Sequence, residues 1–252
     1  MPAAIRIGTS GWHYAHWAGR FYPPGLGPPG WLTYYAARFP AVEVNNTFYR
    51  LPTADVFERW SAETPPGFMF AVKVSRYLTH FNRLAPRWDR YRRFFDTVAA
   101  LGGRLGPLLF QLPPRFPPDP ARLDDFLAAM PTGFHPAFEF RDPGWLVDPV
   151  LAVLERRRAA LVFWDFEGTG PPLVETGDFV YVRLHGPGSR YQGSYSDAAL
   201  AEWAARLRCW AGAGREAWCF LDNDDKAFAV TDAARLRAML ESKGPGPEGP
   251  GP

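Results

Sequence analysis

The chain has 252 residues, of which 47% are hydrophobic and 21% are charged, and it carries a formal net charge of +2 at pH 7. These proportions are typical of globular domains, so they exclude a disordered chain, a coiled coil and a collagen. The small net charge gives no indication of a polyanionic partner. The longest apolar runs have the length of strands, far below the roughly 18 residues of a membrane span. The first run begins almost at the N-terminus, so we expect a cytoplasmic protein with no targeting segment and no membrane partner.

Cysteine and lysine are scarce in this chain. Cys209 and Cys219 are the only cysteines, and they lack the spacing of a metal site, which favours two reduced thiols in the cytoplasm. Of the 28 cationic residues, only Lys73, Lys226 and Lys243 are lysines, and the other 25 are arginines. A lysine inside an apolar strand is therefore unusual here.

Strand-like apolar runs alternate with loops rich in glycine and proline and with amphipathic helical patterns. The expected strands are residues 5–9, 42–46, 68–75, 108–112, 137–141, 161–165, 179–185 and 218–222. The expected helices are residues 31–39, 54–63, 87–101, 121–130, 146–158, 197–210 and 231–240. Eight strands that alternate with helices over about 250 residues predict a single α/β domain, a closed (β/α)8 TIM-like barrel. The alternative is an open doubly wound sheet, but no Gly-rich phosphate turn follows a strand.

Three local signals refine this pattern. Asp119 followed by Pro120 predicts a helix start, because the carboxylate accepts backbone N–H groups and proline fixes φ. The connection between Asp165 and Phe179 contains three glycines and two prolines, so we expect no regular helix between strands six and seven. Residues 243–252, which read KGPGPEGPGP, predict a disordered tail after a domain that covers residues 1–242.

A basic run, RWDRYRR at residues 87–93, has the composition of a nucleic-acid contact. However, aromatic and apolar residues recur through it at three- and four-residue steps, at Trp88, Tyr91, Phe95 and Val98. That spacing predicts a helix with one buried stripe, so the arginines are expected on its solvated face.

Polar side chains close seven of the eight expected strands. In a parallel barrel all strands finish at one face, where active sites lie, and residues two apart point the same way. The expected ring consists of Glu43, Asn45, Lys73, Ser75, Gln111, Glu139, Arg141, Asp165, Arg183, His185, Asp222 and Asn223. Buried charges cost several kcal/mol unless they are paired, so these residues either plug the barrel as mutual ion pairs or form a functional site.

Several of these strand ends belong to longer motifs. They are GTSGWHY at 8–14, FYP at 21–23, VEVNNTFY at 42–49, TH at 79–80, GPLLFQLPP at 106–114, EFR at 139–141 and YVRLHG at 181–186. In these motifs the chain resembles the YecE-like family, domain of unknown function 72, and the resemblance extends from residue 8 to about residue 240. The resemblance implies a TIM-type barrel and assigns no activity. It departs at residues 221–224, where Leu221, Asp222, Asn223 and Asp224 stand in place of a phenylalanine, two asparagines and an aspartate.

Four interpretations of the ring remain open. In the first, Glu43 and Glu139 are a carboxylate pair for acid–base work, as in glycoside or ester cleavage, and His185 carries the proton. In the second, Glu43, Glu139, Asp165 and His185 bind a divalent metal, although a single histidine and nearby cations speak against it.

In the third interpretation Lys73 is a Schiff-base nucleophile, with an ion pair to Glu43 as the structural alternative. In the fourth, cations at the barrel mouth hold a phosphate or a carboxylate, namely Lys73, Arg76, His80, Arg141, Arg183 and His185. Aromatic residues of the nearby loops could stack a sugar or a base, and these are Trp12, Tyr14, Trp17, Phe48, Tyr49 and Tyr191. No catalytic role is expected for His13, His16 or His135.

The sequence therefore predicts a hydrolase or lyase that acts by general acid–base chemistry on a small anionic or polyhydroxylated ligand. Its predicted catalytic residues are Glu43, Lys73, Glu139 and His185. Its predicted substrate-binding residues are Trp12, Asn45, Tyr49, Gln111, Arg141, Asp165, Arg183 and Asn223. No cofactor is expected, with a divalent metal left open. The alternatives are a non-catalytic nucleic-acid or nucleotide binding protein and a metal-assisted phosphoesterase.

Overall fold

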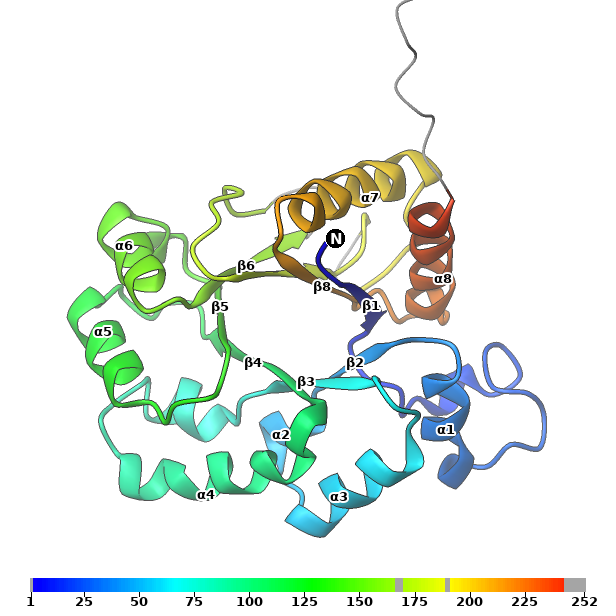
Figure 1. Ribbon diagram of the computed structural model, residues 1–252, viewed down its shortest axis with the longest axis horizontal. Helices are drawn as coiled ribbons and strands as arrows, with labels where there is room; N and C mark the ends of the chain where they lie inside the picture. Colours follow the sequence, from blue (N-terminus) through cyan, green and yellow to red (C-terminus); the bar gives the residue numbers. More distant parts are fainter. Residues whose placement is uncertain (1, 166–169, 189–190, 243–252) are drawn as a thin grey trace, which may run out of the picture.

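The computed structural model describes residues 2–165, 170–188 and 191–242. In these ranges eight parallel strands form one curved sheet in the order β1-β8-β7-β6-β5-β4-β3-β2, and the helices surround it (Figure 1). The strands are β1 (Ile5–Thr9), β2 (Ala41–Val44), β3 (Met69–Lys73), β4 (Leu105–Leu112), β5 (Pro136–Phe140), β6 (Ala160–Asp165), β7 (Phe179–Leu184) and β8 (Glu216–Leu221). The α-helices are α1 (Trp31–Ala36), α2 (Asn46–Tyr49), α3 (Ala54–Glu63), α4 (Trp88–Val98), α5 (Pro120–Ala129), α6 (Asp148–Arg156), α7 (Asp197–Gly212) and α8 (Phe228–Glu241). The predicted (β/α)8 barrel is confirmed.

The barrel interior is filled by alternate residues of the strands, because successive side chains of a strand point to opposite faces. Small and large side chains share this interior: Ala41, Ala71, Leu109, Ala137, Ala160, Val162, Phe179, Tyr181, Trp218 and Phe220. The intervening residues, such as Val42 and Phe70, face the helices and pack in the larger core between sheet and helices. Each strand is therefore apolar on both faces along most of its length, and it becomes polar only at its end.

The seam between β1 and β2 closes the barrel without a full ladder. Its upper part is a parallel bridge between Ser10 and Glu43. Lower down, the Tyr35 hydroxyl accepts a hydrogen bond from Thr9 N at 2.8 Å and donates one to Ala41 O at 3.1 Å. At Gly8 a Cβ atom would lie 2.1 Å from Ala41 O. The two strands can approach this closely because residue 8 has no side chain.

Local signals in the sequence correspond to what is observed. Asp119 caps α5 by accepting a hydrogen bond from Arg122 N at 3.0 Å, with Pro120 in the first turn. Residues 170–178, between β6 and β7, contain no helix, as predicted for the described part of this connection. Residues 166–169 and the predicted tail, 243–252, lie outside the described residues.

Helix α4 buries its predicted aromatic stripe. Tyr91, Phe95 and Val98 are buried, whereas Arg90 and Arg92 are exposed to solvent. The helix ends at Val98, three residues earlier than predicted, because the chain passes into a 3-10 turn over Ala99–Arg104. The basic run therefore lies on a solvated helix face.

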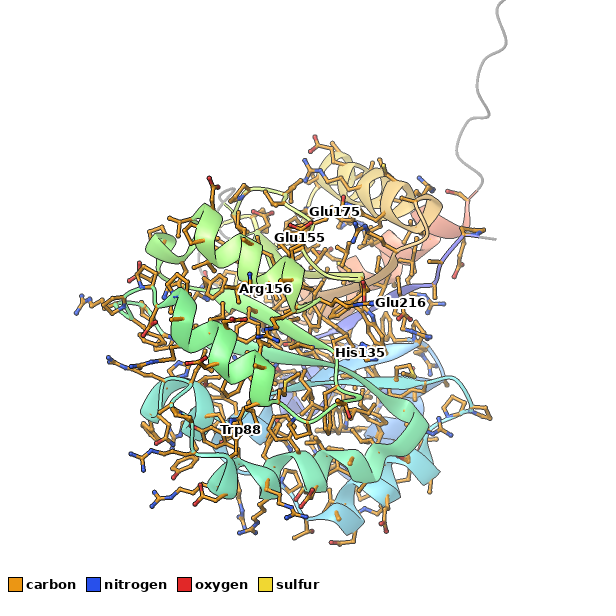
Figure 2. The ribbon with its side chains drawn as sticks, turned by 60° about the vertical axis from the view of Figure 1, so that its left-hand side comes forward. Trp88, His135, Glu155, Arg156, Glu175 and Glu216 are labelled. Carbon is orange, nitrogen blue, oxygen red and sulfur yellow. The ribbon has the colours of Figure 1, made fainter. Side chains whose placement is uncertain are left out.

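The N-terminal ends of the strands lie opposite the polar strand ends. His135 precedes β5 and Glu216 begins β8, and both lie toward this end of the barrel (Figure 2). Cys209 and Cys219 are free thiols, the first exposed and the second buried. No helix in the described part of the chain has the length and apolar character that a membrane crossing requires.

The seam predicts that Gly8→Ala destabilises the barrel. The added methyl group overlaps the Ala41 carbonyl oxygen, so β1 and β2 must separate, and overpacking of this kind costs about 1–3 kcal/mol. The free energy of unfolding in urea measures this loss. Gly103→Ala is the matched control, because a Cβ at that position meets nothing within 4 Å. Equal stability of the two variants would contradict the role given to Gly8.

Candidate functional site

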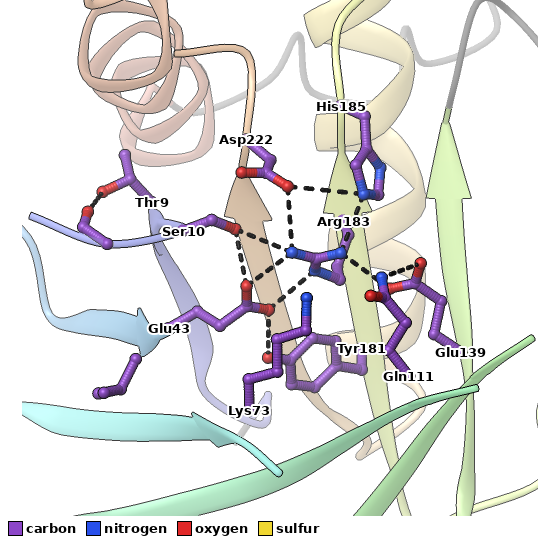
Figure 3. Close-up of polar contacts among 12 residues, drawn as sticks. Thr9, Ser10, Glu43, Lys73, Gln111, Glu139, Tyr181, Arg183, His185 and Asp222 are labelled. Carbon is purple, nitrogen blue, oxygen red and sulfur yellow. Dashed lines mark hydrogen bonds and ion pairs between the residues drawn. The ribbon is translucent and has the colours of Figure 1, made fainter. Parts of the chain in front are cut away.

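A layer of polar side chains closes the barrel interior where the strands end (Figure 3). Each member continues the inward-facing series of its own strand. On β7, for example, Phe179 and Tyr181 face inward and Arg183 comes next. The layer consists of Ser10, Glu43, Lys73, Gln111, Glu139, Tyr181, Arg183, His185 and Asp222. Side chains far apart in the sequence thus meet because strand register brings them to one level.

Arg183 lies at the centre of this layer and is 1% exposed. Its Nε and one terminal nitrogen donate to the two oxygens of Glu43 at 2.9 and 2.8 Å. Its other terminal nitrogen donates to Glu139 at 2.8 Å and to His185 Nε2 at 2.9 Å. Asp222 accepts a further bond at 3.1 Å. The guanidinium is thus held by three carboxylates and is fully desolvated.

Glu43 and Glu139 are both fully buried, and each has further donors. Glu43 accepts from the hydroxyls of Ser10 and Tyr181, both at 2.8 Å. Burial alone would raise the pKa of the Glu43 carboxyl, but the charges of Arg183 and Lys73 outweigh it and hold the pKa below the usual range. This carboxylate therefore stays ionised.

Glu139 has a similar environment on the other side of Arg183. It accepts from the Gln111 amide at 2.8 Å and forms an ion pair with Arg141 at 2.5 Å. Burial opposes its ionisation, yet Arg183 and Arg141 hold the pKa of Glu139 far below its usual range. The surroundings therefore lower the pKa of both glutamates, whereas a carboxylate pair that does acid–base work needs one carboxyl with a raised pKa.

His185 is buried next to two arginines. Its Nε2 is 2.9 Å from both Arg183 and Arg141. Because a guanidinium only donates, Nε2 must be an acceptor, which places the ring proton on Nδ1. Burial, reinforced by the Arg183 charge, lowers the pKa of His185 well below its usual value. The ring is therefore neutral, and its Nε2 is occupied by protein donors.

Lys73 reaches the layer from the end of β3, and its side chain points toward the Arg183 guanidinium (Figure 3). Among the described residues, no carboxylate oxygen lies within 4.0 Å of its Nζ, so the alternative of a direct ion pair with Glu43 is wrong. Nζ lies instead 4.7 Å from the centre of the Phe48 ring. Burial and the charge of Arg183 lower the pKa of the Lys73 ammonium to about 8.

Asp222 comes from the end of β8, and its side chain remains 14% exposed. Burial raises the pKa of this carboxyl to about 7, because the charge of Arg183 does not fully compensate for desolvation and Glu43 adds to the rise. Lys73 and Asp222 therefore have pKa values shifted toward neutrality from opposite directions. Such a pair is typical of groups that exchange protons with a ligand.

Both groups line a cavity of about 520 Å3 above the layer. Its wall consists of Tyr14, His16, Asn45, Tyr49, Lys73, Arg183, Tyr191, Gln192, Asp222, Asp224 and Asp225. The Oδ1 atom of Asn45 is buried and has no hydrogen-bond partner among the described residues. Asp224 accepts from Trp17 Nε1 at 2.6 Å, and burial raises the pKa of this carboxyl to about 6.

Two hollows of about 650 Å3 lie elsewhere. One is lined by Ile5, Ile7 and Leu240, and the other by Phe21, Phe39 and Phe228. Neither contains a buried charged group. The cavity over Lys73 brings Lys73, Asp222 and Asp224, all titratable groups of shifted pKa, to one concave wall, and such a combination is how ligand sites are recognised.

Not all predicted site residues come together. Lys73, Asn45, Tyr49 and Arg183 line the cavity, and Gln111, Glu139 and His185 lie in the polar layer with Glu43. Arg141 joins them through its ion pair with Glu139. By contrast, Asp165 lies on the outward face of β6 and forms a side-chain hydrogen bond with Tyr195. Asn223 donates to Asp232 of α8 at 2.8 Å. Trp12 is buried edge-on against Trp60, with ring centres 5.0 Å apart.

Sequence reasoning also missed members of the site. Ser10 and Tyr181 were not predicted, and Asp222 was considered only as a strand end. The signal for Ser10, Tyr181 and Asp222 was the alternation along β1, β7 and β8. Tyr14 and Tyr191 were named only as aromatic residues of nearby loops, and both line the cavity.

The metal interpretation does not fit the donor set. The guanidinium of Arg183 occupies the space between Glu43 and Glu139, and Asp165 faces away from both. In the described ranges, no group of three or more His, Cys, Asp or Glu side chains has an arrangement that could hold a metal ion. The residues of this layer therefore offer no site for a divalent cation.

A family model and solved structures match this chain over most of its length, and a curated relative matches part of it. A family model with the description "Protein of unknown function DUF72" matches residues 6–251. The UPF0759 protein YunF of Bacillus subtilis is 33% identical over 120 residues, which cover 44% of this chain and only 41% of YunF. A solved DUF72 family protein from Thermotoga maritima has a TM-score of 0.82 at 26% identity, covering 94% of this chain and 99% of that one. Another, from Enterococcus faecalis, has a TM-score of 0.80 at 18% identity over 96% and 97% of the two chains, a likeness in fold alone.

The network predicts that Arg183→Met is strongly destabilising at pH 7. It leaves Glu43 and Glu139 buried without their shared cation, and breaking a buried pair in this way costs about 3–5 kcal/mol. In the wild type, folding lowers the pKa of both glutamates and so stabilises the folded protein. This stabilisation is fully present above the pKa that the glutamates have in the unfolded chain. It is lost as the pH falls toward the lower pKa that they have in the folded protein. In the variant, burial raises these pKa values instead.

The difference in free energy of unfolding between the wild type and Arg183→Met should therefore become smaller as the pH falls from 7 to 5, because the glutamates of the variant become protonated. Urea unfolding at several pH values measures it. Arg158→Met is the matched control, because its partner Asp178 is exposed and the pair contributes little. A gap that stays constant with pH would argue against the burial of ionised glutamates.

Proposed function

Because the chain belongs to the DUF72 family, whose description assigns no activity, we propose its function from its own site. The protein is an enzyme, a hydrolase or a lyase, that acts by general acid–base catalysis on a small anionic or polyhydroxylated substrate in the cavity over Lys73. Lys73 and Asp222 transfer the protons. The observation that carries this proposal is that both side chains line one cavity with pKa values of about 8 and about 7.

These values suit proton transfer at neutral pH. A general acid or base works best when its pKa lies near the working pH, because it then combines the correct protonation state with sufficient driving force. Between pH 7 and pH 8 the Asp222 carboxylate acts as the base and the Lys73 ammonium acts as the acid. Glu43 and Glu139, with lowered pKa values and no exposed oxygen, are proposed as the support that fixes Arg183.

The charge balance of the layer favours exchange of a proton between the two groups. Among the described residues, the layer holds the cations Lys73 and Arg183 and the carboxylates Glu43, Glu139 and Asp222, and Arg141 adds a third cation through its ion pair with Glu139. When Lys73 and Asp222 are both ionised, the sum of charges is zero. When both are neutral, the sum is again zero, so a proton can move between them through the substrate without leaving an unbalanced buried charge.

The remaining wall of the cavity suits a substrate with several hydroxyl groups. Asn45 offers an unpartnered buried oxygen, and Asp224 and Gln192 supply further polar groups. Tyr49, 70% exposed, and Tyr191 add aromatic faces of the kind that stack on sugar rings. The ammonium of Lys73 would hold a carboxylate or phosphate of the same molecule. We propose that the enzyme acts in the cytoplasm, where Cys209 and Cys219 remain free thiols.

Asp222→Asn replaces the carboxylate by an amide at nearly constant shape. This substitution separates proton transfer from packing, since the amide can still accept a hydrogen bond from Arg183 but has no titration near pH 7.

A second candidate function is non-catalytic nucleotide binding. The observation in its favour lies at the rim of the cavity, where Arg76 is exposed between two exposed aromatic rings. Its guanidinium carbon is 5.5 Å from the centre of Tyr49 and 5.4 Å from that of Phe81, which is 67% exposed. In such an arrangement the cation can bind the phosphate of a nucleotide, and the aromatic rings can stack on its base.

The enzymatic proposal predicts that ligand stabilisation and turnover depend on Lys73 and Asp222. In a thermal-shift screen of sugars, sugar phosphates and hydroxy acids, a true ligand at 100 times its Kd stabilises the protein by about 2.7 kcal/mol. For a compound that also reacts, kcat should be bell-shaped between limbs near pH 7 and pH 8. Asp222→Asn removes the limb near pH 7, and Lys73→Met lowers kcat by about 100-fold or more.

Asp178→Asn is the matched control for this experiment. Asp178 is an exposed carboxylate before β7, at the opposite end of the barrel, so its removal leaves the pH profile unchanged. The proposal is wrong if Asp222→Asn and Lys73→Met both keep the wild-type profile.

Nucleotide binding predicts a different response to salt. Affinity for single-stranded oligonucleotides should fall steeply with ionic strength, in proportion to the phosphates neutralised, and Arg76→Ala should reduce that slope by about one. Fluorescence anisotropy at several salt concentrations measures it, with Arg158→Ala as the control. A flat salt response removes this candidate.

A further inference from the structure

The geometry of the cavity points to covalent chemistry at Lys73: we propose that its Nζ forms a Schiff base with a carbonyl group of the substrate. This proposal rests on the proposed function, and it narrows the substrate class to small aldehydes or ketones that carry hydroxyl or carboxylate groups. Lys73 would then be the nucleophile as well as a proton-transfer group.

The position of Lys73 meets the requirements of such a nucleophile. Lys73 extends from the last position of β3 to the wall of the cavity, and its Nζ lies 4.7 Å from the centre of the Phe48 ring. Among the described residues, no carboxylate within 4.0 Å holds it as an ion pair. The charged groups that face it are Arg183, Glu139, Glu43 and Asp222, and the net effect of burial and these charges favours the free amine.

The groups around Lys73 could complete the reaction. The neutral amine adds to the carbonyl carbon and gives a carbinolamine. Protonated Asp222 donates its proton to the carbinolamine hydroxyl, which leaves as water, so that a protonated imine and the Asp222 carboxylate remain. The carboxylate can then remove a proton from the substrate while the imine accepts the electron pair. The buried Oδ1 of Asn45, which has no partner in the described part of the chain, is available to accept a hydrogen bond from the carbinolamine hydroxyl.

The scarcity of lysine makes this proposal easy to test. The chain contains only Lys73, Lys226 and Lys243, and Lys226 is exposed and serves as an internal reference. At pH 7 a pKa of about 8 leaves about a tenth of Lys73 as free amine. An ordinary lysine, with a pKa of about 10.4, has fewer than one in about a thousand in that form.

The experiment is reductive trapping of the wild-type protein at pH 7. Glyceraldehyde and pyruvate serve as an uncharged and an anionic carbonyl probe, sodium cyanoborohydride reduces any imine, and peptide mass spectrometry locates the adduct. We expect Lys73 to be labelled at least tenfold faster than Lys226 by one of the probes. Labelling of Lys73 that is no faster than that of Lys226 overturns the proposal.

Two variants separate the covalent step from the acid–base function. Lys73→Arg keeps the charge and removes the nucleophile, so it abolishes trapping at residue 73, and its melting temperature shows whether the fold is intact. Asp222→Asn should slow trapping at Lys73 because carbinolamine dehydration loses its acid. If ligands stabilise the protein through Lys73 and the kcat profile is bell-shaped, yet no adduct forms, the Schiff base is excluded while the proposed function stands. If an adduct forms at Lys73 but Asp222→Asn leaves kcat and its pH profile unchanged, the proposed proton transfer is wrong instead.

Discussion

The buried charge of Arg183 is the interaction on which the rest of this site depends. A guanidinium that is 1% exposed is tolerated only if anions replace its lost hydration, and Glu43, Glu139 and Asp222 do so. The two glutamates belong to β2 and β5, on either side of the barrel, so the pairs also tie distant strands to β7. Apolar residues could fill this level of the barrel with less cost, which makes a function beyond stability the better explanation.

The charge of Arg183 also explains why Lys73 and Asp222, the proposed proton-transfer groups, differ from Glu43 and Glu139, which hold Arg183 in place. Arg183 lowers the pKa of Glu139 and of Glu43 because it contacts both directly and they have no access to water. It also disfavours the charged form of Lys73, since two cations share one desolvated region. Asp222 is the most distant of its three carboxylate partners, at 3.1 Å, and is the one in which desolvation prevails. The charge of Arg183 therefore keeps Glu43 and Glu139 ionised, while Lys73 and Asp222 have pKa values near neutrality.

The sequence was sufficient for the fold, and it named most of the side chains that meet in the polar layer. Repeated apolar runs, Asp119 with Pro120 and the stripe on α4 are local signals that the tertiary structure reinforces. For the site, the end of a strand was the right place to look, but strand ends alone do not give the direction of a side chain. Asp165 and Asn223 are one residue out of phase with the inward series, so they face the outer layer, whereas Asp222 is in phase.

What could not be predicted depends on long-range register. Glu43 pairs with Arg183 rather than Lys73 because of the heights along the barrel axis at which β2, β3 and β7 end. These heights depend on the seam at Gly8 and on the tilt of the strands in the barrel. Glu43 is held by Arg183 at both oxygens, and no carboxylate in the described ranges forms an ion pair with Lys73, the lysine for which we propose covalent chemistry. A different register of β7 by two residues would put Tyr181 at the level of the glutamates and leave both without a cation. The chemistry proposed for Lys73 thus follows from the same strand alignment that closes the barrel.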